Sequence, residues 1–216
     1  MKSTVYTRGK TKAKLSGDHV ARHAIEGFGK DCGVTGLTNG SFSLISLISA
    51  VLDVTGPAEV LVSTWSAGFY DLTAIEALMQ SGNILDFRMI LDRSFATRKE
   101  SYKKTVDELF APEKIRTTNM HSKFVLIRND EWSVTIRSSM NLNENKRCEN
   151  FDVDNNEVVY RLFSDFADEL FAKQQPGVIE SRNIVDPVFD SLFPPAEMAA
   201  QKKDYDFPKM LARFGD

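Results

Sequence analysis

Four side chains near the middle of the chain have residue types that could act together on a phosphoryl group. They are His121, Lys123, Ser139 and Asn141. The imidazole could attack phosphorus, while the ammonium, the amide and the hydroxyl could stabilise the charge that builds on the oxygens. Such chemistry needs no metal ion. We therefore take these four residues as candidate catalytic residues.

The four residues stand at the ends of two segments that the sequence pattern predicts as neighbouring strands. Residues 121–128 and 132–138 are rich in β-branched and apolar side chains, and Asn129-Asp130 between them favours a turn. Because side chains alternate along a strand, the imidazole and the ammonium should point the same way. The segment after the second strand can then bring the hydroxyl and the amide to the same place.

Each residue also has a simpler explanation. A single histidine that begins a strand is more often a structural residue than a nucleophile, and Lys123 could lay its stem along the sheet edge with its charge in water. Asn141 or Asn143 could be the N-cap of a helix. The chemical interpretation depends on the residues occurring together and in this order.

The pattern resembles the signature of the phospholipase D superfamily, which is HxKx4D followed by GSxN. His121 and Lys123 match its first element, and Ser139 and Asn141 match its second. The downstream run "KRCENFDVDNNE" is similar to the family segment in which a Glu-Asn pair opens the next strand. The resemblance therefore implies that Glu149 orients the catalytic histidine.

The sequence departs from the family signature at three points. Ser138 replaces the usual glycine, and Arg128 stands where the motif has its aspartate, with Asp130 as the nearest acid. The distance between the two motif elements is also longer than usual, by about three residues. The departures at Arg128 and Ser138 would fit a nucleic-acid-binding or structural module that keeps the fold without the activity.

The hydrophobic pattern predicts an α/β fold in which strands and helices alternate before the paired strands. The resemblance implies a phospholipase D-like mixed β-sheet flanked by helices, with one half-site per chain. Asn39 or Ser41 should cap the second helix and Asp71 the third. The expected order is helix 18–27, helix 39–54, strand 58–65, helix 71–82, strand 84–92, helix 97–110, segment 114–118, the two strands above and helix 157–174.

We expect three regions along the chain. Residues 1–36 should form a basic N-terminal arm with a short helix, and residues 37–175 the phospholipase D-like domain. Residues 176–216 contain five of the seven prolines and should form a C-terminal appendage. Its short apolar clusters should pack on the domain, and docking of a partner is the alternative. The chain has no internal repeat.

Composition is that of an ordinary globular protein, with 42% hydrophobic and 26% charged residues among 216. Cys32 and Cys148 are too few for a disulfide framework. The start of the sequence lacks the apolar core of a signal peptide, and no apolar run reaches membrane-spanning length. We expect a cytoplasmic protein without membrane insertion.

Charge is unevenly distributed along the chain. Residues 93–147, which hold the candidate site, carry twelve basic and seven acidic side chains, although the whole chain has a net charge of −3. Residues 1–30 are also basic, with seven Lys or Arg against two acids. Localised positive charge favours a polyanionic substrate such as nucleic acid.

The resemblance also implies a homodimer. The active site of the fold normally needs two facing HxK elements and this chain has one, and single-motif members of the family form the site across a two-fold axis. One His121 would form a phosphohistidine and the partner's His121 would serve as acid and base. No cofactor and no metal are implied.

Two other groups of residues in the sequence have side chains that could form a site. His19 and His23 are four residues apart but lack a third metal ligand. Trp65, Phe69 and Tyr70 follow a predicted strand and could stack on a base, although core packing or a dimer contact is the simpler use.

The most specific function that the sequence supports is a metal-independent endonuclease that cleaves DNA or RNA. A nucleic-acid-binding or structural protein with the same fold is the first alternative. A phospholipase or phosphatidyltransferase is the second, and it would more often expose an apolar surface for binding to lipid.

Overall fold

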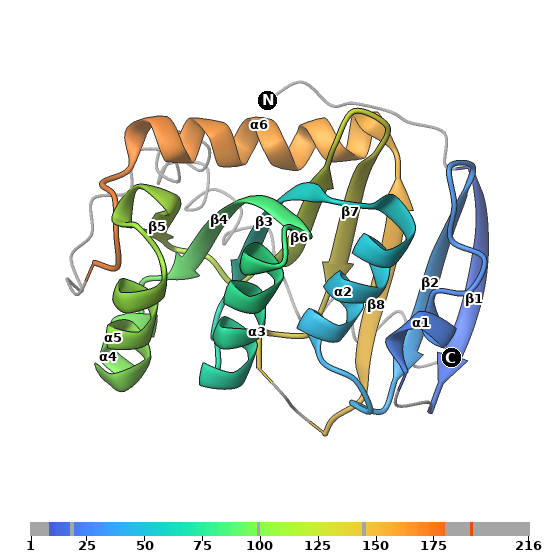
Figure 1. The fold of residues 1–216 in the computed structure, drawn as a ribbon, viewed down its shortest axis with the longest axis horizontal. Helices are drawn as coiled ribbons and strands as arrows, with labels where there is room; N and C mark the ends of the chain where they lie inside the picture. Colours follow the sequence, from blue (N-terminus) through green and yellow to red (C-terminus); the bar gives the residue numbers. More distant parts are fainter. Residues whose placement is uncertain (1–8, 18–19, 99, 144–145, 180–190, 192–216) are drawn as a thin grey trace, which may run out of the picture.

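A single mixed β-sheet of eight strands forms the centre of the molecule (Figure 1). The structure is a computed structural model that describes residues 9–17, 20–98, 100–143, 146–179 and 191. From one edge to the other the strands are β1 (Lys10–Ser16), β2 (Cys32–Thr38), β8 (Glu149–Asn155), β7 (Ser133–Ser138), β6 (Lys123–Arg128), β3 (Ala58–Thr64), β4 (Ile84–Asp92) and β5 (Ile115–Thr118).

The sheet is parallel at its two edges and antiparallel in its centre. β1 is parallel to β2, and β3, β4 and β5 are parallel to one another, whereas the neighbours from β2 through β8, β7 and β6 to β3 are antiparallel. Helices flank this sheet, which confirms the expected α/β fold class. They are α1 (Ala21–Ala24), α2 (Leu44–Thr55), α3 (Phe69–Gln80), α4 (Phe95–Arg98), α5 (Glu100–Leu109) and α6 (Glu157–Lys173), with a 3-10 turn at Pro112–Lys114.

Side-chain alternation along β3 divides the core into two layers. Val60 and Val62 belong to the large cluster that includes the buried residues of α2 and α3. Leu61 lies on the opposite face, in a smaller cluster with Tyr160 and Leu170 of α6. Because successive residues of a strand face opposite sides, α6 covers one face while α2 and α3 cover the other (Figure 1).

Helix α2 begins and ends at residues whose chemistry explains its limits. The side chain of Ser43 caps it by accepting a hydrogen bond from the N–H of Ser46 at 3.4 Å, so the expectation of Asn39 or Ser41 as cap was wrong. Gly56 ends the helix at a φ of 76°, a conformation that glycine adopts without steric cost.

Most of the other predicted elements lie close to their expected positions, but β2 was not predicted as a strand. α1 covers only Ala21–Ala24 of the helix expected over 18–27, and the helix expected over 97–110 is divided into α4 and α5. β4 is the predicted strand 84–92, and α6 ends one residue before the predicted limit. α3 begins at Phe69, so Asp71 lies in its first turn and the cap position belongs to Gly68. The prediction that Asp71 is the cap was therefore wrong, although a carboxylate in the first turn favours the helix dipole.

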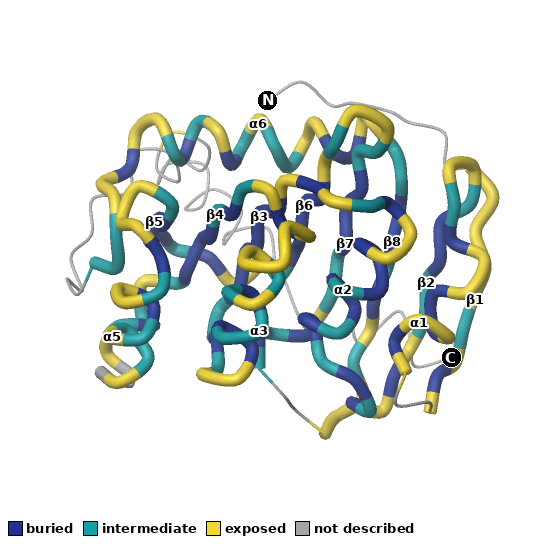
Figure 2. The backbone as a smooth tube through the Cα atoms, viewed as in Figure 1, coloured by how far each residue is buried: buried dark blue, intermediate teal, exposed yellow. Residues whose placement is uncertain are grey.

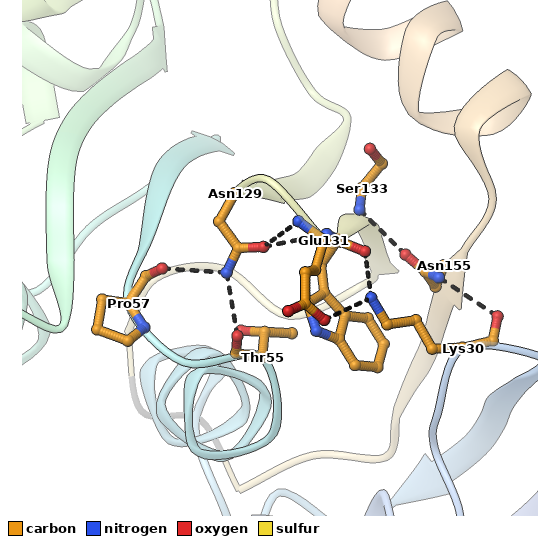
Figure 3. Close-up of polar contacts among 8 residues, drawn as sticks. Lys30, Thr55, Pro57, Asn129, Glu131, Ser133 and Asn155 are labelled. Carbon is orange, nitrogen blue, oxygen red and sulfur yellow. Dashed lines mark hydrogen bonds and ion pairs between the residues drawn. The ribbon is translucent and has the colours of Figure 1, made fainter.

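The turn between β6 and β7 is held in place by Asn129 (Figure 3). Its side-chain oxygen accepts from the N–H groups of Glu131 and Trp132, both at 3.0 Å. Its side-chain nitrogen donates to the carbonyls of Thr55 and Pro57 at 3.0 and 3.1 Å. The predicted turn chemistry is confirmed, and it attaches the far end of the hairpin to the end of α2.

The N-terminal region is more ordered than a basic arm. Residues 10–16 form β1, which pairs in parallel with β2, and the expected boundary after residue 36 falls inside β2. The arm prediction was therefore wrong for this segment, because alternating lysines gave no apolar signal for an edge strand that is mostly exposed (Figure 2). Residues 1–8 lie outside the described residues.

The start of the C-terminal region lies along β5. Gly177 donates its N–H to the carbonyl of Ile115 at 3.0 Å, and Thr117 donates its hydroxyl to the carbonyl of Gly177 at 3.0 Å. Packing of the rest of the appendage stays a prediction, since most of it lies outside the described residues. Within the described part of the chain, no helix is long and apolar enough to cross a membrane.

Candidate active site

The candidate residues gather where the central strands β6, β7 and β8 begin or end, at the lower side of Figure 1, where the segment between β7 and β8 runs. This end of the strands is called the site edge of the sheet below. β6 begins at Lys123, β7 ends at Ser138 and β8 begins at Glu149. Lys123 pairs with Ser138 across the antiparallel ladder, and Ser138 pairs with Phe151. This register places the start of β6, the end of β7 and the start of β8 side by side.

Lys123 reaches back over His121. Its Nζ lies 3.2 Å from Nδ1 and 3.4 Å from Nε2 of the imidazole, and it donates to the backbone carbonyl of His121 at 2.7 Å. The imidazole itself is exposed. The ammonium of Lys123 and the exposed imidazole of His121 thus lie next to each other, as the two-residue spacing predicted.

The backbone between these two residues is attached to β3. The hydroxyl of Ser63 donates to the carbonyl of Ser122 at 3.0 Å. Ser63 is fully buried at the end of the strand. The His-Ser-Lys segment is therefore fixed to the centre of the sheet, even though its side chains face outward.

Ser138 and Ser139 connect the end of β7 to the start of β8. Ser138 donates its hydroxyl to the carbonyl of Asn150 at 2.7 Å and accepts from the N–H of Met140 at 2.9 Å. Ser139 donates to the carboxylate of Glu149 and accepts from the N–H of Asn150 at 2.9 Å. Ser138, which stands where the resembled motif has glycine, is thus a structural link at the site.

Asn141 lies in a loop that is joined to the end of β3. The next residue, Leu142, donates its N–H to the Ser66 carbonyl and to the Thr64 hydroxyl, both at 3.1 Å. The side-chain oxygen of Asn141 is buried and lacks a hydrogen-bond partner among the described residues. A buried amide oxygen without a partner costs about 1–3 kcal/mol.

Comparison with known proteins supports the fold through structure alone. No protein-family model and no curated protein matches the sequence. NucT from Helicobacter pylori matches with a TM-score of 0.50 and 15% identity, over 67% of this chain and 99% of that one. The chain has a phospholipase D-like fold.

Two further solved structures were found at lower similarity. Nuc from Salmonella typhimurium, a phospholipase D family member, has 14% identity and a TM-score of 0.47, over 67% of this chain and 96% of its own. Phosphatidylserine synthase from Haemophilus influenzae Rd KW20 has 13% identity and a TM-score of 0.44, over 79% of this chain and 46% of its own.

Within this phospholipase D-like fold, the expected residues form two groups rather than one network. His121 and Lys123 form the first, and Ser139 and Glu149 form the second. Across the described residues, Glu149 makes no hydrogen bond to His121. Its expected role in orienting the imidazole therefore stays a prediction. The helix-cap alternative for Asn141 finds no support, because residues 139–143 are not helical.

Arg128 lies at the opposite end of β6 from the catalytic candidates. Its guanidinium stands 3.6 Å from the Glu157 carboxylate and 5.2 Å from the ring centroid of Tyr160. The position that holds an aspartate in the family thus has a local structural use here. Asp130 lies in the turn beyond it and does not approach the site.

Trp65 is the site residue whose role the sequence left open. Its indole lies beside the imidazole of His121, with ring centroids 5.6 Å apart and planes inclined by 60°. The available signal was its position directly after strand β3, at the same edge of the sheet. No group of three or more potential metal ligands occurs within the described ranges, and His19 lies outside them.

Proposed function

We propose that this protein hydrolyses phosphodiester bonds of nucleic acid through a phosphohistidine on His121, in a site shared by two copies of the chain. The observation that carries the proposal is the position of His121 beside Lys123, at the same sheet edge as Ser139 and Asn141, in a phospholipase D-like fold.

In the first step the imidazole of His121 attacks the phosphorus. A P–N bond forms and the bond from phosphorus to the leaving oxygen breaks. The partner's His121, protonated beforehand, gives its proton to that oxygen, so the leaving strand departs as an alcohol. Lys123 and Asn141 hold the non-bridging oxygens while negative charge builds on them.

In the second step water replaces the histidine. The partner's His121, now neutral, takes a proton from water as the water oxygen attacks phosphorus. The P–N bond breaks, His121 is released, and a phosphate monoester remains on the other strand end. Since the partner's histidine regains its proton, both subunits return to their starting states.

A site shared by two chains is supported by the single HxK element and the exposed histidine of each chain. His121 is exposed rather than enclosed, and the polar contacts of its imidazole within the described residues are with Lys123. The sequence supplies one HxK element, whereas the two-step reaction needs a nucleophile and a separate acid. A second copy related by a two-fold axis would supply the acid from the same residue.

Nucleic acid as the substrate is supported by three basic side chains near the candidate site. Arg93 follows β4, and its backbone N–H donates to the carbonyl of Thr118 at 2.9 Å. This hydrogen bond places Arg93 close to the segment that leads to His121. Lys146 and Arg147 precede β8 on the other side. All three side chains are exposed and make no ion pair with any described residue. Such unpaired cations favour a substrate that carries several phosphates.

The decisive experiment is cleavage of plasmid and single-stranded DNA in EDTA, with the wild type and His121→Ala. The wild type should cut both and His121→Ala neither, while His23→Ala, which changes an exposed histidine on α1, should cut normally. Equal cutting by His121→Ala would contradict the mechanism. DNA retardation without cutting would favour a binding protein, and headgroup release from phospholipid vesicles a phospholipase.

A further inference from the structure

Trp65 is the aromatic side chain in contact with the proposed nucleophile. The indole and the imidazole of His121 make a tilted edge contact at a centroid distance of 5.6 Å. Aromatic pairs in this arrangement contribute about 0.5–1.5 kcal/mol beyond the area that they bury. Trp65 is half-buried, whereas His121 is exposed, so the indole is the better fixed of the two rings.

The backbone around Trp65 is held by hydrogen bonds on both sides. The buried hydroxyl of Thr64 donates to the carbonyl of Ser66 at 2.7 Å and accepts from the N–H of Leu142. Gly68 donates its N–H to the carbonyl of Leu142 at 2.7 Å. The loop that carries Trp65 is thereby joined to the loop that carries Asn141.

The end of β3 therefore organises both halves of the proposed site. Through Ser63 it holds the backbone beside His121, and through Thr64 it holds the loop of Asn141. Trp65 follows directly and is the residue of this strand end that touches the imidazole side chain. Backbone fixation alone leaves the side-chain rotation of an exposed histidine free, and the ring contact restricts it.

From these contacts we propose that Trp65 is a positioning residue for His121, an inference that rests on the proposed function. The indole holds the imidazole ring in one orientation at the sheet edge, next to Lys123, so that the ring is aligned for attack before substrate binds. Orientation matters because a misplacement of about 1 Å can reduce the rate of a reaction about 100-fold. Trp65 itself makes no bond to the substrate.

A fluorescence titration tests the contact without any assay of activity. The chain has two tryptophans, so Trp132→Phe leaves Trp65 as the only one. Trp132 is a suitable residue to remove because it lies at the far end of the sheet, against Phe28 and Lys30. Protonated imidazole quenches a neighbouring indole, and histidine is the side chain that usually changes charge between pH 5 and 8.

Emission of the Trp132→Phe protein should therefore fall as the pH is lowered through this range. The change should disappear when His121→Ala is added and persist when His23→Ala is added instead. A pH-independent emission of Trp132→Phe would overturn the proposal.

Kinetics test the consequence for the reaction. Trp65→Leu should lower kcat about 100-fold with little change in KM, because the lost contact aligns the nucleophile rather than the substrate. Trp65→Phe, which keeps an aromatic ring, should recover most of the rate. Unchanged kcat in Trp65→Leu would overturn the positioning role. Full activity of His121→Ala would instead reject the proposed function, and the fluorescence titration would still decide whether the contact exists.

Discussion

The hydroxyl of Ser139 donates a hydrogen bond to the carboxylate of Glu149 and accepts one from the N–H of Asn150 at 2.9 Å. This closed link joins the end of β7 to the start of β8 beside the candidate nucleophile. It assigns Glu149 a partner within its own chain that differs from the imidazole which the family resemblance implied. The carboxylate therefore fixes the orientation of the Ser139 hydroxyl at the end of β7.

The Ser139–Glu149 link predicts that the two side chains act as one unit. Ser139→Ala and Glu149→Ala should each lower kcat/KM on DNA about 10-fold, and the double variant should be no worse than either single variant. Residues that act together give such non-additive losses in a double-mutant cycle. The measurement is steady-state cleavage of a labelled oligonucleotide.

Glu149→Gln provides the matched control, because its amide oxygen can still accept from Ser139. It should retain more activity than Glu149→Ala. Additive losses in the double variant would show that Glu149 acts on another group, and His121 would then be the first residue to test.

Substitution of Arg128 should change the stability of the protein without changing its activity. Arg128→Asp introduces the residue that the resembled motif has at this position, yet it removes an ion pair with Glu157 and a cation–π contact with Tyr160. We expect a loss of about 1 kcal/mol in the free energy of unfolding by urea. Cleavage should be unaffected, because β6 places this residue roughly 17 Å from Lys123. A gain in activity would contradict this assignment.

The same substitution should have a pH-dependent effect. Hydrogen bonds from Ser133 and Arg161 lower the pKa of Glu157 from its ordinary value of 4.5. Stability from this carboxylate is therefore present at neutral pH and lost as the pH falls through its folded pKa. Because the carboxylate introduced by Arg128→Asp would repel the charged Glu157, the destabilisation should be largest near pH 7 and should shrink in acid.

Much of the fold could be predicted because its centre has strong local signals. The apolar run of β4 gave correct limits, and the periodic face of α6 gave nearly correct ones. β1 could not be predicted in this way, since its lysines alternate with small residues and its order comes from pairing with β2. Edge strands of this kind depend on partners that are distant in the sequence.

The sequence was enough to choose the candidate site residues but not to predict all of the contacts among them. His121 and Lys123 are in contact, as their spacing predicted, although β6 begins only at Lys123 and the predicted strand 121–128 started two residues too early. The link between Ser139 and Glu149 spans a connection between strands, and the contact of Trp65 with His121 depends on the order of strands in the sheet. Neither relationship is visible in local spacing.

Salt dependence should show whether the cations at the site edge bind phosphate. In a His121→Ala background, which prevents cleavage, the affinity for a single-stranded oligonucleotide should fall with salt. Arg93→Ala and Arg147→Ala should each reduce the slope of log K against log salt by about 0.7, the value for one phosphate contact on a single strand. Lys114→Ala, at the opposite end of β5, should leave the slope unchanged. Equal slopes for all variants would argue against nucleic acid as the substrate.

A mixed dimer tests the shared site directly. Wild-type and His121→Ala chains that carry different tags can be co-expressed, and the heterodimer can be isolated by two successive affinity steps. If the reaction needs both histidines, this species should have less than about 1% of the wild-type rate, because its one remaining His121 can act as the nucleophile or as the acid but not as both. A site complete within one chain would instead retain about half of the activity. A monomer in light scattering at micromolar concentration would likewise contradict the shared site, whatever the rate.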